Sequence, residues 1–451
     1  MGIIILIMPS EKRKTVFIET LGCPKNRVDS EVLERALFMS GWRVVGKPHD
    51  AEAVVINTCG FIEDAKAESI ETVWEFIRAK EAGLIETVVV TGCLAERYAQ
   101  VLGDEMPELD VVLGNRDPRA IVRAMEASRN VNSQPLVSTP EAFLADWYED
   151  ALCVGNRPWA FVKVTEGCDN RCSYCAIPAI RGGLRSAPLE SIVARCRQLV
   201  ENGTRELVLV GQDTTAFGLD SGENRFPELL RSISAIDGDF WIRVMYSHPR
   251  NLTEKNISAL AETPKVAPYL DLPIQHISDG ILDRMGRHTD GNHIRRIVRD
   301  IEERISGIAL RTSVIVGFPG ETDADFDQLV EFLDEGHFIH GGVFAYSPED
   351  GTPSALFQDS IDGETVAERK LFVEMIFDRI RHESNLVMEG RTVRVLVESE
   401  GSRPGLIWGR TEFDAPEIDR NLRFRGEVEV GSFADVMIIR GSGFHLLGVQ
   451  V

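Results

Sequence analysis

Three cysteines lie close together in the sequence at a spacing that suits an iron–sulfur cluster. Cys168, Cys172 and Cys175 form a C-x₃-C-x₂-C pattern directly after a predicted strand. Thiolates on one short loop can bind three irons of a 4Fe-4S cube, which leaves the fourth iron without a protein ligand. That iron can chelate S-adenosylmethionine, and an electron passed through the cluster can cleave the sulfonium to a 5′-deoxyadenosyl radical. Zinc is the alternative, although a structural zinc usually takes four ligands in paired spacing.

Three further cysteines are far apart in the sequence but occupy equivalent positions. Cys23, Cys59 and Cys93 each follow a predicted strand and precede a predicted helix. The carboxyl ends of parallel strands form one edge of a sheet, so we expect these cysteines to converge. Helix N-termini at that edge would stabilise thiolates and an anionic cluster. We predict a second three-cysteine 4Fe-4S site, the alternative being three buried structural cysteines.

The two remaining cysteines, Cys153 and Cys196, have no partner at ligand spacing. Cys196 falls within a helical pattern and Cys153 within a predicted linker. We expect both to be structural, because free cysteine is among the residue types most often buried.

The dispersed triad belongs to a predicted domain at residues 14–127. Short β-branched apolar runs alternate there with helical periods, which predicts an open parallel α/β sheet. The predicted strands are Thr15–Thr20, Ala53–Asn57, Thr87–Thr91 and Val111–Leu113, and the predicted helices are Val28–Ser40, Ile62–Lys80, Ala95–Leu102 and Pro118–Ala127. Residues 128–153 carry Asn, Ser and Pro with few periodic apolar positions, so we expect a linker.

The compact triad opens a second α/β series at residues 154–384. Six strand and helix units predict three quarters of a (β/α)₈ barrel, that is a partial (β/α)₆ TIM-like barrel, with its active site at the carboxyl ends of the strands. The predicted strands are Phe161–Val164, Glu206–Val210, Trp241–Tyr246, Tyr269–Leu272, Ala309–Val316 and Gly342–Tyr346. The predicted helices include Leu189–Glu201, Thr253–Glu262, His293–Ile305, Asp323–Glu335 and Val366–Met388.

The last segment, residues 387–451, changes to short strands separated by turns. We predict strands at Thr392–Glu398, Leu406–Gly409, Gly426–Glu429, Ala434–Arg440 and His445–Val449. Five such strands indicate a small all-β barrel of the OB-like kind.

The overall charge favours some partners over others. The 451 residues carry a formal net charge of −22. A nucleic-acid binder gains affinity by neutralising phosphates with Lys and Arg, whereas an acidic surface attracts a basic protein. The alternative is that the acidity only keeps the chain soluble. The apolar start, Met1–Met8, is too short to span a bilayer and lacks the basic region of a signal peptide, so we expect a cytoplasmic protein without membrane contact.

Together these residues resemble the radical S-adenosylmethionine methylthiotransferases over nearly the whole chain. Besides the cysteines, the segments that carry the resemblance are Leu21–Ser30, Asn57–Ile70, Gly211–Thr215, Asp271–His276 and Asp414–Asp419. The resemblance implies an N-terminal methylthiotransferase domain, a radical S-adenosylmethionine barrel and a C-terminal TRAM barrel. It is closest to the branch that methylthiolates the β-carbon of an aspartate in small-subunit ribosomal protein S-twelve, and the branch that modifies tRNA adenosine is the alternative.

The resemblance also implies cofactors and partners. It implies two 4Fe-4S clusters, with S-adenosylmethionine as both radical source and methyl donor. The cluster of the compact triad would generate the radical, and the cluster of the dispersed triad would hold the sulfur that becomes methylated. The implied partners are a basic ribosomal protein as substrate, a flavodoxin or ferredoxin as electron donor and a sulfur donor, with tRNA the less favoured substrate.

Contacts with S-adenosylmethionine follow from the resemblance as well. The implied residues are Tyr174 and Gly317 near the adenine, Gly211 and Gln212 near the amino acid portion, and Arg181 near the carboxylate or the substrate. Arg185 is a further candidate for the last role, and His248 and His276 fall at predicted strand ends. A packing or surface role remains the alternative for each, because position in a fold does not assign a role.

The predicted third domain carries more carboxylates than arginines and no lysine. An RNA-binding face would ordinarily show clustered positive charge. Asp414, Glu417 and Asp419 instead predict docking against a basic protein, the alternative being a solvated surface. A non-catalytic adaptor with two structural zinc sites is the competing class of function, and metal analysis separates it from a radical enzyme.

Overall fold

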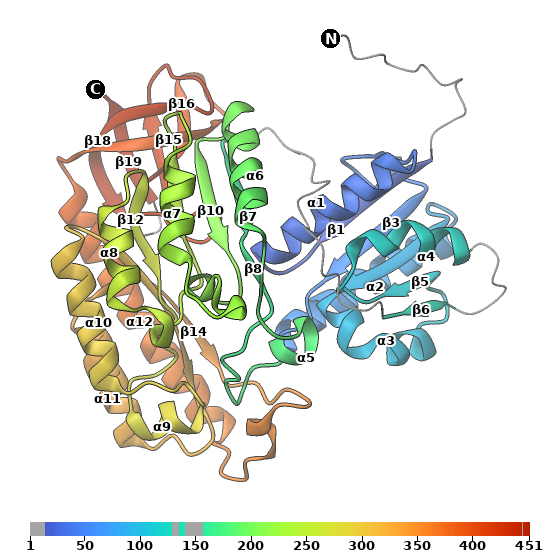
Figure 1. The fold of residues 1–451 in the computed structure, drawn as a ribbon, viewed down its shortest axis with the longest axis horizontal. Helices are drawn as coiled ribbons and strands as arrows, with labels where there is room; N and C mark the ends of the chain where they lie inside the picture. The colour runs from blue at the N-terminus through green and yellow to red at the C-terminus, as the bar shows by residue number, and fades with distance from the viewer. Residues whose placement is uncertain (1–13, 129–134, 140–156, 444) are drawn as a thin grey trace. The chain divides into compact units, whose positions relative to one another are not determined.

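The computed structural model describes residues 14–128, 135–139, 157–443 and 445–451 (Figure 1). These residues fall into two units, residues 1–152 and residues 153–451. Cys153 lies outside the described residues, so its predicted structural role stays a prediction.

Six parallel strands form the sheet of the N-terminal unit, in the order β2-β1-β3-β4-β5-β6. Their bounds are Arg43–Val44 for β2, Thr15–Thr20 for β1, Ala53–Thr58 for β3, Thr87–Gly92 for β4, Val111–Leu113 for β5 and Leu136–Ser138 for β6. The predicted open parallel domain is therefore confirmed. Strand β6 was not predicted: it lies within the expected linker, residues 128–153, yet pairs in parallel with β5.

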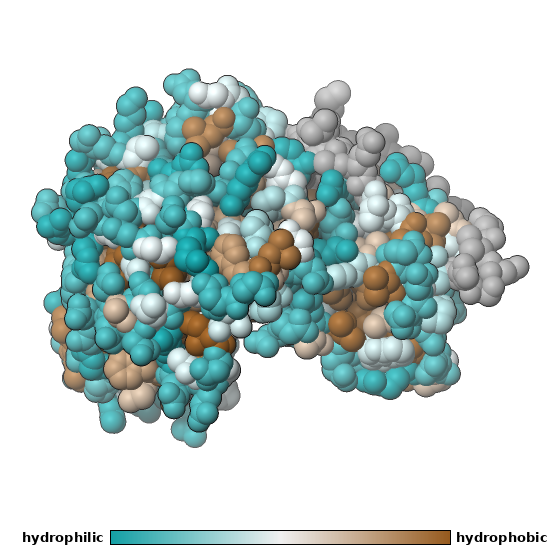
Figure 2. Space-filling model, turned by 90° about the horizontal axis from the view of Figure 1, so that it is seen from below, coloured by the Kyte–Doolittle hydropathy of each residue, from teal (hydrophilic) through white to brown (hydrophobic). Residues whose placement is uncertain are grey.

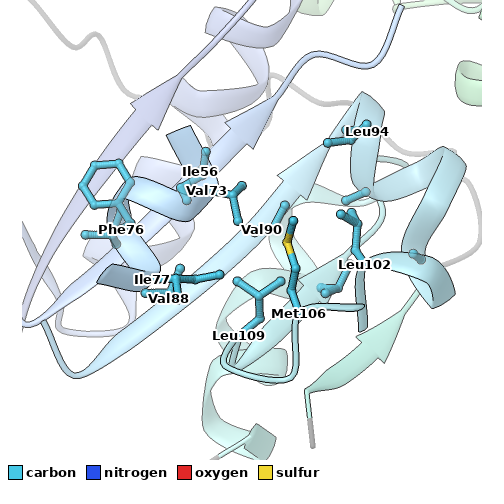
Figure 3. Close-up of a cluster of buried hydrophobic side chains, with 14 of the residues drawn as sticks. Ile56, Val73, Phe76, Ile77, Val88, Val90, Leu94, Leu102, Met106 and Leu109 are labelled. Carbon is cyan, nitrogen blue, oxygen red and sulfur yellow. The ribbon is translucent and has the colours of Figure 1, made fainter. Parts of the chain in front are cut away.

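Helices cover both faces of this sheet. Helices α1 (Pro24–Met39) and α4 (Ile121–Ser128) pack on one face, and α2 (Glu63–Glu81) and α3 (Cys93–Glu105) pack on the other. The layers arise because neighbouring strand residues point to opposite faces, as Val55 and Ile56 do. Figure 3 shows the core beneath α2 and α3, which includes Leu94, so the residue after Cys93 is anchored in the core.

The second unit contains a six-stranded parallel sheet in the order β7-β10-β11-β12-β13-β14. The strands are Trp159–Lys163, Glu206–Val210, Trp241–Val244, Val266–Asp271, Ala309–Val316 and Phe338–Ala345 in that order. The helices between and after them are α6 (Leu189–Glu201), α7 (Phe226–Ser234), α8 (Glu254–Glu262), α9 (Asp279–Arg284), α10 (Gly291–Arg304), α11 (Asp323–Asp334) and α12 (Gly363–Met388). This is the predicted partial (β/α)₆ barrel.

Short elements follow the first barrel strand. Strands β8 (Thr165–Glu166) and β9 (Arg185–Ser186) pair antiparallel and enclose the cysteine loop and the short helix α5 (Ile177–Arg181). Single 3₁₀ turns occur at Pro48–Asp50, Pro118–Ala120, Thr214–Ala216, Leu219–Ser221, Pro249–Asn251 and Pro353–Leu356.

The chain ends in a closed five-stranded barrel, as predicted. Its strands are β15 (Thr392–Glu400), β16 (Leu406–Thr411), β17 (Asn421–Arg425), β18 (Phe433–Ser442) and β19 (His445–Gln450). The predicted strand at Gly426–Glu429 is wrong, because the third strand precedes it. In β17, Leu422 and Phe424 face the core and alternate with the exposed Arg423 and Arg425. Two apolar residues are too few to predict this strand from the sequence.

The small barrel packs on the strand starts of the larger one. Glu206 begins β10, is fully buried, and accepts hydrogen bonds from Arg243 of β11 and Arg410 of β16. Burial alone would raise the pKa of Glu206, but Arg243 and Arg410 lower it. The contact lies at the opposite end of the strands from the cysteine loop, at the end where residues usually serve stability.

Two carboxylates predicted to dock a basic protein belong to this internal interface instead. Asp414 and Asp419 are 1 % and 9 % exposed. The His340 ring lies 3.3 Å from Asp414 Oδ1 and 3.5 Å from Asp419 Oδ1. Arg311 donates to Asp419 at 2.7 Å, and Arg420 donates to Asp414 at 2.7 Å. The docking prediction is therefore wrong for both residues, since their charges are neutralised within the chain.

The outer surface agrees with the charged composition. On the face shown in Figure 2, hydrophilic residues predominate and hydrophobic residues occur in small separate groups. Within the described ranges, no helix combines the length and the apolar character that crossing a membrane would require.

Candidate active site

The three dispersed cysteines occupy neighbouring loops at the carboxyl edge of the N-terminal sheet. Cys23 is the N-cap residue of α1, Cys59 follows β3, and Cys93 is the first residue of α3. Pro24 at the first position of α1 explains why this helix starts before the predicted Val28, since proline is favoured there.

Two glycines show how closely these loops pack. A Cβ atom on Gly22 would lie 3.0 Å from Sγ of Cys59, so the segment before Cys23 touches the second cysteine. A Cβ atom on Gly60 would lie 2.7 Å from both N and Cα of Leu94, so the segment after Cys59 touches the third loop. The fold thus brings the three cysteine loops together, as the strand-end positions predict.

Asparagine side chains tie the loops to one another. Asn26 Nδ2 donates to the carbonyls of Leu21 and Thr58 at 2.9 and 3.1 Å. Its Oδ1 lies 3.7 Å from Cys93 Sγ, and Asn115 Nδ2 donates to the same sulfur at 3.5 Å. Sequence reasoning missed both asparagines; the position of Asn115 just after β5, at the same sheet edge, was the available signal.

The compact triad lies on a tight loop after β8. Gly167, with φ +75°, begins the turn, and a Cβ there would lie 2.1 Å from the carbonyl oxygen of Gly183. Arg171 adopts φ 52°, which brings the chain back between Cys168 and Cys172. The loop is fixed to the helix end of α9, because Ser173 N donates to Met285 O at 2.8 Å.

Burial raises the pKa of two thiols in this loop. Burial, assisted by neighbouring anionic groups, raises the pKa of Cys168 and of Cys175 to about 12. Without metal, both groups are therefore neutral thiols near pH 7. Metal binding must release their protons, because the thiolate is the ligand.

Side-chain donors surround the sulfurs of this loop. Asn170 Nδ2 donates to Cys168 Sγ at 3.3 Å and to Asp213 Oδ2 at 2.8 Å. Arg287 Nη1 donates to Cys172 Sγ at 3.5 Å, and His248 Nε2 lies 4.0 Å from that sulfur. Donors aimed at thiolates are what an anionic cluster requires. Of these three donors, the sequence analysis singled out only His248.

The chemistry of the donor sets fits iron–sulfur clusters. Each triad offers three cysteine sulfurs, and a 4Fe-4S cube binds each thiolate at a different iron. A structural zinc usually takes four ligands.

Two implied cofactor contacts meet at Glu166, which is buried. Arg181 donates to Glu166 Oε1 at 2.8 Å, and Lys163 donates to Oε2 at 2.6 Å. Burial would raise the pKa of Glu166, but Arg181 and Lys163 lower it. Gln212 Nε2 donates to the same carboxylate at 3.3 Å, while its Oε1 is buried and accepts no hydrogen bond from the described residues. Arg181 is thus engaged in an ion pair, and Gln212 keeps an acceptor for a ligand.

The remaining implied contacts pack against neighbouring residues, and their contact with S-adenosylmethionine stays a prediction. Gly211 allows close approach, since its Cβ would lie 2.1 Å from Thr165 Oγ1. Gly317 has φ +74°, and its Cβ would lie 2.4 Å from Val366 Cγ2. Gly317 also lines a pocket of about 580 Å³ at the end of β13. Tyr174 packs edge-on to Phe318, with centroids 6.5 Å apart.

Two further candidates, Arg185 and His276, make local contacts. Arg185 donates to the carbonyl of Arg181 at 3.2 Å. His276 is fully buried, and its Nδ1 accepts from Ser278 N at 3.0 Å. Cys196 is fully buried in α6, in agreement with a structural role.

Comparison with family models divides the chain into three matches. Residues 15–114 match the model described as uncharacterized protein family UPF0004. Residues 162–333 match the radical SAM superfamily, and residues 390–451 match the TRAM domain. The radical SAM match falls on the partial barrel, and the TRAM match falls on the closed barrel.

Curated relatives match nearly the full length. The chain is 42% identical over 439 residues to ribosomal protein uS12 methylthiotransferase RimO of Heliobacterium modesticaldum, covering 97% of this chain and 95% of the relative. It is 40% identical over 435 residues to the protein of the same name from Thermotoga maritima, covering 96% and 99%. Both values are far above what shared fold alone produces.

Solved structures support the fold only. The radical S-adenosylmethionine methyltransferase TsrM of Kitasatospora setae superimposes with a TM-score of 0.57 at 17% identity, over 77% of each chain. The cobalamin-dependent S-adenosylmethionine radical enzyme OxsB gives a TM-score of 0.53 at 13% identity, over 81% of this chain and 56% of that one.

Proposed function

The chain belongs to the RimO family of ribosomal protein uS12 methylthiotransferases, and on this premise we propose that each of its two cysteine triads binds one 4Fe-4S cluster. The protein is a radical S-adenosylmethionine methylthiotransferase, whose barrel uses one such cluster with S-adenosylmethionine. The second cluster, at Cys23, Cys59 and Cys93, is the part of the proposal that goes beyond the family assignment. The observation that carries it is the contact of Gly22 with Cys59 and of Gly60 with Leu94.

When bound, the two clusters and S-adenosylmethionine would supply a 5′-deoxyadenosyl radical, which removes a hydrogen atom from the substrate. They would also supply a sulfur, which is methylated and added to the substrate carbon. The residues of the chain hold and orient them. Cys168, Cys172 and Cys175 hold the radical-generating cluster, and Asn170 orients the sulfur of Cys168. The free Oε1 of Gln212 offers an acceptor to the amino group of S-adenosylmethionine.

The substrate is ribosomal protein uS12, and we propose the β-carbon of one of its aspartates as the site of modification. Its basic character suits an acidic enzyme of net charge −22. A reduced flavodoxin or ferredoxin would deliver the electron, and a sulfur donor would replenish the second cluster. We place the reaction in the cytoplasm. The proposed domains are residues 14–127, 154–384 and 387–451, with β6 adding Leu136–Ser138 to the first.

Product analysis tests this assignment. Anaerobically reconstituted enzyme with S-adenosylmethionine, sulfide and a reductant should add the mass of one methylthio group to a uS12 peptide. The Cys172→Ala variant should form no 5′-deoxyadenosine. The Cys93→Ala variant should still form it but yield no methylthio peptide. Cys196→Ala, which removes a buried cysteine outside both triads, is the control and should behave as the unmodified chain does.

Two results would overturn the proposal. Methylthiolation of tRNA adenosine without modification of the peptide would move the substrate to the other branch of the family. Formation of the methylthio peptide by Cys93→Ala at the normal rate would remove the dispersed triad from the reaction.

A further inference from the structure

Arg287 is a buried cation beside the cysteine loop. It follows α9 and is only 4 % exposed, although arginine is almost never buried unless paired. Its backbone N–H donates to Leu282 O at 3.0 Å, which fixes the start of the side chain. In the sequence it lies 115 positions from Cys172, so only the fold brings the two together.

The guanidinium is held in one orientation by three contacts. Nη1 donates to Cys172 Sγ at 3.5 Å and to the hydroxyl of Tyr174 at 3.4 Å. Nη2 donates to the carbonyl of Pro273 at 2.6 Å. Nε is buried and has no hydrogen-bond partner in the part of the chain that the structure describes. These contacts direct the planar guanidinium group at Sγ of Cys172.

This charge has no direct ion pair with a carboxylate among the described residues, although buried Asp213 attracts it from a greater distance. Among the residues that the structure describes, no Asp or Glu lies within ion-pair distance of Arg287, whereas buried Arg243 and Arg410 both pair with Glu206. A buried charge without a direct ion pair is costly. A 4Fe-4S cube with three thiolates is anionic, and it would supply the missing negative charge at Cys172.

A neighbouring donor differs from Arg287 in its charge. His248 Nε2 lies 4.0 Å from the same sulfur, and its Nδ1 accepts a hydrogen bond from Arg250 N at 3.2 Å. That bond places the ring proton of the neutral histidine on Nε2, so His248 offers a dipole to the sulfur. Arginine offers a full positive charge that is never lost.

We propose that Arg287 is a positioning residue of the cluster at Cys168, Cys172 and Cys175, and that its buried charge raises the reduction potential of this cluster. The proposal rests on the cluster assigned above. Reduction adds one electron to an anionic group, and a fixed cation at its sulfur stabilises the more negative state. The external reductant therefore meets a cluster that accepts its electron more readily.

A redox titration tests the proposal. The full chain carrying Cys23→Ala, Cys59→Ala and Cys93→Ala is the parent, because it retains only the cluster in question. Its midpoint potential is measured by electron paramagnetic resonance during titration with dithionite, without S-adenosylmethionine. Arg287→Met and Arg287→Gln remove the charge, and both should shift the midpoint to more negative potential. Arg284→Met removes a half-exposed arginine of α9 that pairs with Asp359, and it should leave the midpoint unchanged.

The possible results distinguish a failure of the cluster assignment from a failure of the role proposed for Arg287. A parent without a 4Fe-4S signal would overturn the cluster itself. Normal signals with unchanged midpoints in both neutral variants would overturn only the role of Arg287. If the neutral variants bind no iron, Arg287→Lys decides. Loading at the parental midpoint supports the role of the charge, and failure of Arg287→Lys to load would overturn it, because that variant keeps the positive charge.

Discussion

A Cβ atom on Gly22 would lie 2.7 Å from Cβ of Cys59, so the backbone before the first cysteine packs directly on the second. Gly22 also adopts φ +85°, which L side chains rarely adopt. Both the turn before Cys23 and its contact with the loop of Cys59 thus depend on Gly22.

Gly22→Ala should therefore damage the dispersed triad. The new methyl group must displace Cys59, so iron per chain should fall towards the content of one cluster. Gly41→Ala is the control, because Gly41 has φ +88° with nothing within 4 Å of its Cβ position. It carries the same backbone strain and should keep full iron. Equal iron in both variants would show that the contact does not matter.

Asn170→Ala should impair the compact triad. The substitution removes the donor to Cys168 Sγ and leaves Asp213 with two side-chain donors, Thr215 and Asn251. Loss of such supporting contacts typically lowers metal affinity or activity about 10- to 100-fold. The rate of 5′-deoxyadenosine formation measures the effect. Asn202→Ala, at the exposed C-cap of α6, is the control, and an equal rate in both variants would refute the role.

Glu206→Gln should destabilise the second unit by about 3–5 kcal/mol, because it leaves two buried arginines without their shared carboxylate. Denaturant unfolding followed by tryptophan fluorescence measures the change, since Trp241 packs on Phe433 at this interface. Glu228→Gln breaks an exposed pair with Arg225 and should have no measurable effect. A loss below about 1 kcal/mol for Glu206→Gln would contradict the assignment.

Asp414 should make this unit sensitive to acid. Burial would raise the pKa of Asp414, but Arg420 and His340 lower it below its usual value. A lowered folded pKa adds stability above the unfolded pKa of about 3.9, and that stability is lost as the pH falls through the folded pKa. The difference in free energy of unfolding between the unmodified chain and Asp414→Asn should stay constant at neutral pH and shrink below about pH 4. A difference that grows on acidification would contradict it.

Buried apolar runs made much of the fold predictable. The bounds of β1, β10 and β13 are the predicted ones, because each strand contains a run of apolar residues and is followed within two residues by a glycine. The repeated order of strand, cysteine and helix placed Cys23, Cys59 and Cys93 at one edge without any long-range information. Edge strands β2 and β6 escaped prediction because they are short and only partly buried, whereas the equally short β5 is fully buried and entirely apolar.

What escaped prediction depends on partners far along the chain. Asp414 and Asp419 resemble surface carboxylates in the sequence, but Arg420 and Arg311 pair with them in the interior. Arg287 gives no local signal either, since its contact with Cys172 forms across two βα units. Sequence periodicity reports which face is buried, not which charges meet there.

Iron and acid-labile sulfide analysis of the anaerobically reconstituted chain tests the two-cluster account most directly. We predict about eight irons and eight sulfides per chain, and about four of each after Cys23, Cys59 and Cys93 are replaced by alanine. The Cys196→Ala chain should keep about eight. Zinc in place of iron, or about four irons in the unmodified chain that persist when the dispersed triad is removed, would contradict the account.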